Sequence, residues 1–190
     1  MSENFSEQDK IKNFLLNGTP VISLTGNEFA KKDGYTLTQQ VTEYYGMLGN
    51  EAMSAVYGNI ILDKQSVEDD FAHGVGRTKA VAFAAVPAVI EKGTVILPLA
   101  QHKKNDKRES AMIAAPIRIA ENDYICVVVI RQYVSGNKKL YVHEVTIKDK
   151  FLVGGSNPTQ MPATQGIVSK SPKNIGDISK VLQNILTANN

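Results

Sequence analysis

Apolar residues along the chain change from helical spacing to strand-like runs near residue 93. Intervals of three and four between apolar residues predict amphipathic helices in four segments: residues 7–16, 36–48, 66–90 and 175–186. Apolar, β-branched runs predict strands in five: residues 20–24, 94–99, 110–119, 124–133 and 139–147. The connections between the last three strands are short enough for hairpins. The pattern therefore predicts an α+β fold, with N-terminal helices, a four-stranded antiparallel β-meander, and a C-terminal helix after a linker.

The longest helical segment follows a short apolar run at residues 59–62. Ser66, with Asp69 three residues later, resembles a capping box that opens a helix. The two glycines within residues 74–76 predict a break or kink. Pro87 is tolerated in the first turn of a helix, so it is expected to begin a last short helix.

The length of 190 residues, 43% of them hydrophobic, suits one substantial core better than two full domains. Residues 151–174 are rich in glycine, proline and small polar residues, which is typical of a linker. The expected organisation has four parts: an N-terminal helical and strand extension at residues 1–58, an α+β domain at 59–150, the linker, and a C-terminal helix at 175–190.

Charge and targeting signals narrow the partners only slightly. Lys and Arg number 21 against 19 Asp and Glu, and a net charge of +2 argues neither for nor strongly against nucleic acid. The N-terminus has no positively charged segment followed by an apolar stretch, and no run approaches the about 18 apolar residues that span a membrane. We expect a cytoplasmic protein without membrane contact.

Cys126 is the only cysteine and lies in an apolar run, so a buried small side chain is expected rather than a catalytic thiol. The glycine-rich and histidine-containing motifs of nucleotide cofactors, hydrolase elbows and zinc proteases are absent from the sequence. Residues 68–70 are acidic, but adjacent positions on a helix present carboxylates together poorly. These residues are expected to be a solvated helix N-terminus, and neither a metal nor a cofactor is expected.

His73, Arg77 and Lys79 are the first candidates for chemistry. His73 and Arg77 are four residues apart and would share one face of an unbroken helix. Each has a structural alternative: His73 as a histidine that caps the end of a helix, and Lys79 as a solvated surface residue.

His143 is the second histidine candidate, in the middle of the last predicted strand. Strict alternation puts it on one face with Tyr141 and, further along, residues 145 and 147, and puts residues 140, 142 and 144 on the other. If Tyr141 and His143 point to an open face they are site candidates, and if they point inward His143 is a hydrogen-bonded core residue.

A basic loop at residues 101–108 holds four cations that suit phosphate groups: Lys103, Lys104, Lys107 and Arg108. A charge run in a turn is more often simply solvated, and the loop contains no aromatic residue on which a base could stack. His102 belongs to the same loop and has the same alternative.

Part of the chain resembles a known family. The motif FAHGVGRTKAVAFAAVPAVIEKGTVI, followed by SAMIAAPIRIAENDYICVVVIR and LYVHEV, is similar to a domain found in very large polyvalent proteins of phages and conjugative elements. That domain is distantly similar to the phage MuF C-terminal module and to the barnase, EndoU and RelE group of RNases. The resemblance covers a little under half of the chain.

The resemblance implies RNA cleavage through attack of the ribose 2′-OH on the adjacent phosphate. His73 and His143 would be the acid/base pair, and Lys79 and Arg77 would stabilise phosphate charge. Arg108 and Ser110 would support the scissile group. To these the strand pattern adds Tyr141, and the basic loop adds Lys103 and Lys104, as substrate contacts. A tryptophan- and glycine-containing stretch expected before the second strand of the meander is replaced here by HKKNDKRES, and the chain has no Trp.

Two functions are therefore expected from the sequence. The first is a mobile-element-encoded, metal-independent RNase or toxin-like effector, with RNA as its partner. The alternative is a non-catalytic binding protein of the same fold that engages a host or rival-element defence protein.

Overall fold

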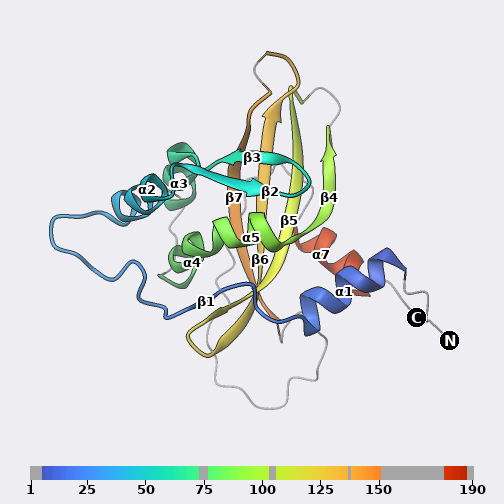
Figure 1. Cartoon of the computed structure of the whole chain (residues 1–190), viewed down its shortest axis with the longest axis horizontal. Helices are drawn as coiled ribbons and strands as arrows, with labels where there is room; N and C mark the ends of the chain where they lie inside the picture. Colours follow the sequence, from blue (N-terminus) through green and yellow to red (C-terminus); the bar gives the residue numbers. More distant parts are fainter. Residues whose placement is uncertain (1–5, 73–76, 103–105, 137, 151–177, 188–190) are drawn as a thin grey trace.

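The computed structural model describes residues 6–72, 77–102, 106–136, 138–150 and 178–187, without the side chains of residues 70–72 and 77 (Figure 1). Seven strands form one mixed sheet, and helices lie over both of its faces (Figure 1). The α+β class predicted from the sequence is confirmed.

The helices begin and end close to the residues that the apolar spacing predicts. They are α1 (Glu7–Asn17), α2 (Leu37–Met47), α3 (Lys64–Ala72), α4 (Arg77–Ala82), the 3₁₀ turn η1 (Phe83–Ala85), α5 (Val86–Lys92) and α7 (Ile178–Thr187). Capping boxes open α1 at Ser6 and α2 at Thr36, where side chains satisfy backbone N–H groups that the helix leaves free. Pro87 lies in the first turn of α5, as predicted.

Helix α3 begins two residues earlier than predicted. The Asp63 side chain accepts a hydrogen bond from the Gln65 N–H at 3.0 Å, and the Ser66 hydroxyl donates to the Asp63 carbonyl at 2.7 Å. Ser66 is therefore inside the helix and does not form the predicted capping box. The acidic residue Glu68 consequently lies within the helix, not at its N-terminus, and pairs with Lys64 at 3.0 Å.

The sheet is larger than the predicted meander. Its strands are β1 (Ser23–Leu24), β2 (Glu51–Ser54), β3 (Gly58–Ile61), β4 (Thr94–Ala100), β5 (Arg108–Ile119), β6 (Asn122–Tyr133) and β7 (Leu140–Asp149). Strands β4 to β7 pair antiparallel in chain order. The sheet continues beyond them, because β3 pairs parallel to β7, β1 pairs parallel to β5, and β2 forms a hairpin with β3. A four-stranded meander alone is thus an incomplete description.

Two strands share one edge of β5, and a proline separates them. β4 pairs with β5 as far as Ala114, and β1 pairs with it from Arg118. Pro116 lies between these points, where its missing N–H removes no ladder bond to either strand. Its carbonyl still accepts a hydrogen bond from the Val21 N–H at 2.9 Å, which helps to dock the segment before β1.

One face of the sheet is covered by α2, α3, α4, η1 and α5, whose apolar residues join the larger core cluster (Figure 1). Hydroxyl groups of α2 fix the layer: Tyr45 donates to the Phe83 carbonyl and Tyr44 to the Ala84 carbonyl, both at 3.2 Å. Gly93 ends α5 so close to β5 that a Cβ there would lie 2.8 Å from Ile113 Cγ2. Its backbone φ of −75° is ordinary, so the close approach and not the conformation explains the glycine.

The other face has a smaller core cluster made by α1 and α7. Leu15 and Leu182 pack there against strand residues that include Met112 and Val129. The next step along the strands is the pair Ser110 and Arg131, where apolar packing gives way to polar residues. Strands β5, β6 and β7 run on past α1 and α7 toward the turn between β6 and β7 (Figure 1).

Candidate functional site

Five polar and aromatic residues from three adjacent strands share this extended end of the sheet face. Register pairs Arg108 with Tyr133, Ser110 with Arg131, and Arg131 with Tyr141. Directly paired residues, and residues two apart on a strand, project from the same face of a sheet. We call these residues the arginine–tyrosine cluster: Arg108, Ser110, Arg131, Tyr133 and Tyr141.

Arg131 is the buried centre of the cluster, with 3% of its surface exposed. Its Nε donates a hydrogen bond to the Ser110 hydroxyl at 3.2 Å. Among the described residues, none of the ion pairs includes Arg131. Burial and the charge of Arg108 lower the pKa of the Arg131 guanidinium, while Asp106 and buried Glu144 offset part of this effect. A guanidinium remains protonated at neutral pH even so, so the site holds a desolvated positive charge.

Arg108 is the more accessible cation, with 38% of its side chain exposed. It forms an ion pair with Asp106 at 3.4 Å and lies close enough to Tyr141 for its charge to offset part of the rise that burial causes in the pKa of the tyrosine hydroxyl. Desolvation raises the pKa of the Asp106 carboxyl, but the hydrogen bonds and charge of Arg108 outweigh it, and the pKa is lowered. Asp106 is therefore ionised, and it holds Arg108 beside Tyr141.

His143 lies next to the cluster, at a bulge in β7. Val142 pairs with Ile130 and Glu144 with Val129, which leaves His143 as an extra residue without a partner position on β6. Burial lowers the pKa of the His143 imidazole to about 4, with further lowering by Arg131 and Arg108 and an opposing effect of Asp69. His143 is therefore neutral at neutral pH and lies in the positive potential of both arginines.

The bulge also changes which residues of β7 face the core. The alternation predicted from the sequence places Val142 and Val145 on opposite faces, but both belong to the larger core cluster. That assignment of faces is wrong, because alternation holds only in a strand without an extra residue. Tyr141 does lie on the face opposite Val142, beside Tyr133.

The structure describes only some of the residues expected to be catalytic. His73 lies outside the described residues, and Arg77 is the first residue of α4 but its side chain is not described. Lys79, also in α4, is half-buried and engaged in an interaction. Helices α3 and α4 both pack against β7, so the helix of Lys79 and the strand of His143 are neighbours, but α4 covers the face of the sheet opposite the arginine–tyrosine cluster (Figure 1).

The basic loop contributes less than its composition suggests. Lys103 and Lys104 lie outside the described residues, and Lys107 is exposed. His102 Nε2 lies 2.8 Å from the Ser110 carbonyl oxygen. This contact ties the His102 side chain to β5, whereas the structural alternative from the sequence was a purely solvated loop residue. With Tyr141, Arg108 and Ser110 are the expected substrate contacts that join the cluster.

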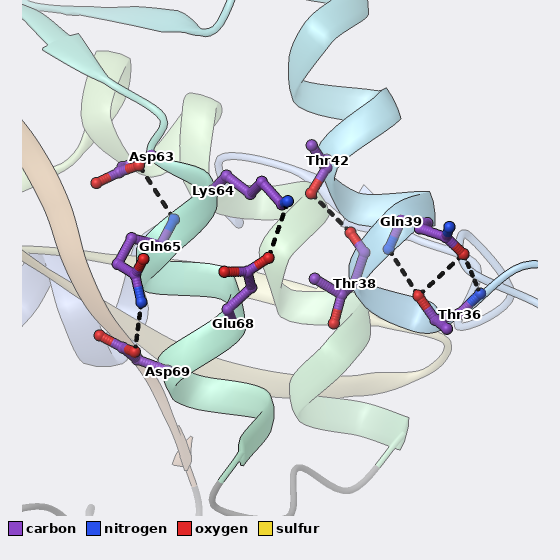
Figure 2. A network of polar contacts seen from close by, with 9 residues as sticks. All are labelled: Thr36, Thr38, Gln39, Thr42, Asp63, Lys64, Gln65, Glu68 and Asp69. Atoms are coloured by element: carbon purple, nitrogen blue, oxygen red, sulfur yellow. Dashed lines mark hydrogen bonds and ion pairs between the residues drawn. The ribbon is translucent and has the colours of Figure 1, made fainter.

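A second polar region lies between α2 and α3, in an open groove of about 640 Å³. Its hydrogen bonds and ion pairs run along each helix: Thr36 with Gln39 on α2, and Lys64 with Glu68 on α3 (Figure 2). Since these groups satisfy each other locally, they do not converge on a common point in the groove. The groove is therefore a weaker candidate site than the arginine–tyrosine cluster.

The described residues hold no reactive thiol, metal cluster or membrane-spanning helix. Cys126 is fully buried, and burial raises the pKa of its thiol to about 12, which agrees with the inert side chain predicted from the sequence. Within these residues, no group of three or more His, Cys, Asp or Glu side chains is arranged to hold a metal ion. No helix among them has both the length and the apolar character needed to cross a bilayer.

Arg131 and Tyr133 were not singled out by sequence reasoning. A signal for Arg131 exists, because it directly follows the apolar run of β6, where a charged residue must find compensation in the sheet. Tyr133 carries no such local signal, since its proximity to Tyr141 follows from the register of β6 and β7.

Comparison of the chain with protein-family models, with curated proteins and with solved structures finds no match. The geometry of the site therefore carries the functional argument.

Proposed function

We propose that this protein is a metal-independent endoribonuclease, of the effector type found in mobile elements, that acts on RNA in the cytoplasm. The observation that carries the proposal is the desolvated charge of Arg131, held beside the more exposed Arg108, two tyrosines and a neutral histidine. Cations that stabilise phosphate and a group that accepts a proton are what this reaction needs.

In this reaction the 2′-oxygen bonds to phosphorus as a base takes its proton. The P–O5′ bond then breaks as an acid protonates the 5′-oxygen, which leaves a 2′,3′-cyclic phosphate and a 5′-hydroxyl. His143 is neutral at neutral pH, so it suits the base and not the acid. His73 remains the proposed acid, and Lys79 and Arg77 remain proposed phosphate contacts, on the family resemblance alone, since α4 packs on the face of the sheet opposite Arg108.

Local electrostatics support an anionic ligand despite the nearly neutral chain. Both arginines lower the pKa of His143, which is the effect of a positive potential at that side chain. A phosphodiester bound to Arg108 would offset this potential and raise the pKa of His143 toward neutrality, where a general base is most effective. Arg131 contributes through its field from below the surface, and Arg108 is placed to touch the phosphate directly.

The proposal is tested by incubating purified protein with mixed cellular RNA in EDTA. We expect the wild type to cleave, His143→Gln to be inactive, and Arg108→Gln to be slower by about tenfold to a hundredfold. Arg118→Gln is the matched control, because Arg118 lies at the other end of β5 and pairs with Asp123 at 2.6 Å. Intact RNA with folded wild-type protein, or equal cleavage by all variants, would overturn the proposal.

The alternative is a non-catalytic protein that binds a host or rival-element defence factor. It is favoured by exposed apolar side chains between the end of α2 and the β2–β3 turn: Met47, Leu48, Met53 and Val56. Under this alternative, Met53→Ser with Val56→Ser abolishes capture of the partner and leaves the RNA in the EDTA assay intact for every variant.

A further inference from the structure

We propose that Tyr133 and Tyr141 form a stacking platform for an unpaired nucleobase, so that the substrate class is single-stranded rather than duplex RNA. The nature of the ligand rests on the proposed function. The platform itself rests on the aromatic geometry beside the arginines.

The two tyrosine rings form a tilted pair at the surface end of the cluster. Their centroids are 6.5 Å apart and their planes differ by 34°, which is within the range of favourable aromatic pairs. Tyr133 keeps 53% of its surface exposed, whereas Tyr141 is partly buried. One aromatic ring is thus held in place against another and still presents a large accessible surface.

Backbone and side-chain contacts hold both tyrosines in position. Tyr133 pairs with Arg108 at the end of the β5–β6 ladder, and the Val134 N–H donates to the Lys107 carbonyl at 2.9 Å, which continues that pairing by one more bond. Tyr141 pairs with Arg131 in the β6–β7 ladder and lies close to Arg108. Burial raises the pKa of the Tyr141 hydroxyl, so this group stays protonated at neutral pH. A rigid aromatic surface binds a base with little loss of conformational entropy.

Stacking platforms and adjacent cations together distinguish single strands from duplexes. Base stacking on an aromatic side chain is available to every base, but only when the base is not already stacked and paired in a helix. Arg108 and Tyr133 are paired across β5 and β6. A phosphate bound to Arg108 and a base stacked on Tyr133 would therefore come from neighbouring nucleotides of one RNA strand. The platform therefore selects RNA with unpaired nucleotides and adds little sequence preference.

The test measures binding without cleavage. The probe is a short fluorescein-labelled 2′-O-methyl oligouridylate, whose blocked 2′-oxygen removes the nucleophile, compared with the same strand in a duplex. We expect fluorescence anisotropy to show tighter binding of the single strand, weakened about fivefold to a hundredfold by Tyr133→Ala and nearly unchanged by Tyr133→Phe. Tyr35→Ala is the control, since Tyr35 is similarly exposed but its ring contacts Lys32.

Each outcome separates this inference from the proposed function. Equal binding by wild type and Tyr133→Ala, a preference for the duplex, or no binding of the probe overturns the platform, and cleavage of unmodified RNA would then still support the RNase. Tyrosine-dependent binding of the single strand, with no cleavage of unmodified RNA in EDTA, supports the platform and overturns the RNase.

Discussion

Replacing His143 by glutamine should remove a loss of stability that the wild type suffers on acidification. The unfolded chain takes up a proton on this histidine with an ordinary pKa of 6.5, whereas the folded protein does so only with a pKa of about 4. Between these values the unfolded state binds more protons, so the free energy of unfolding falls as the pH falls. The loss of stability due to His143 is absent above a pH of about 6.5 and complete below a pH of about 4.

The size of the effect follows from the shift in pKa. The pKa of His143 differs by about 2.5 between the unfolded and the folded state, and each pKa unit changes the free energy of unfolding by about 1.36 kcal/mol. The full effect is therefore about 3.4 kcal/mol. His143 is only partly buried, and screening by solvent reduces this to about 1–2 kcal/mol. Glutamine has a polar side chain of similar length and does not titrate, so the variant should lack this pH dependence.

The assay is urea unfolding of wild type and His143→Gln at a series of pH values, followed by far-ultraviolet circular dichroism because the chain has no Trp. Carboxylates titrate equally in both proteins, so the difference between the two stability curves isolates His143. We expect the wild type to lose about 1–2 kcal/mol relative to the variant between about pH 6.5 and about pH 4. Parallel curves, or an imidazole pKa near 6.5 by nuclear magnetic resonance, would refute the buried position of this side chain.

Three further predictions concern stability and are checked by the same unfolding measurement near neutral pH. Gly93→Ala should cost about 1–3 kcal/mol because its Cβ would overlap the Val89 carbonyl oxygen and meet Ile113 and the Ala114 carbonyl. Gly34→Ala, at an open turn position with positive φ, is the comparison for backbone strain alone, and equal costs would contradict the contact argument. Leu182→Ala should cost about 3 kcal/mol by leaving a cavity under α7, and a neutral result would mean that this helix does not pack on the sheet. Thr36→Ala should cost about 1 kcal/mol through loss of the capping box of α2, while Thr36→Ser should be nearly neutral.

Local patterns in the sequence predict most of the helices and strands but not which distant strands pair in the sheet. The boundaries of β5 and β6 differ by no more than two residues from those predicted, because apolar runs and turn residues are local signals. The parallel pairings of β1 with β5 and of β3 with β7 join distant segments and have no local signal. Strands β2 and β3 were not predicted as strands. The four residues of β2, Glu51–Ser54, alternate too briefly to be distinguished from a loop, and those of β3 fall in what was described only as a short apolar run.

The site was predicted only where strand register was not needed. Arg108 and Ser110 were expected from the family resemblance and Tyr141 from the alternation of its strand, and the three do lie together. Arg131 and Tyr133 join them through the register of β6 with its neighbours, which the sequence does not display residue by residue. The bulge at His143 makes the predicted faces of β7 wrong for the same reason, because the apolar pattern does not show where a strand has an extra residue.

The bulge has a consequence for how this chain changes in evolution. Because Val142 and Glu144 already pair with consecutive residues of β6, loss of the His143 codon leaves both flanks of β7 in register and every later side chain on its present face. In a strand without such an extra residue, a deletion of one codon would move every later side chain to the opposite face of the sheet. A lineage is therefore free to gain or discard this histidine in a single step, so its retention among descendants would record selection on the imidazole and not on the fold.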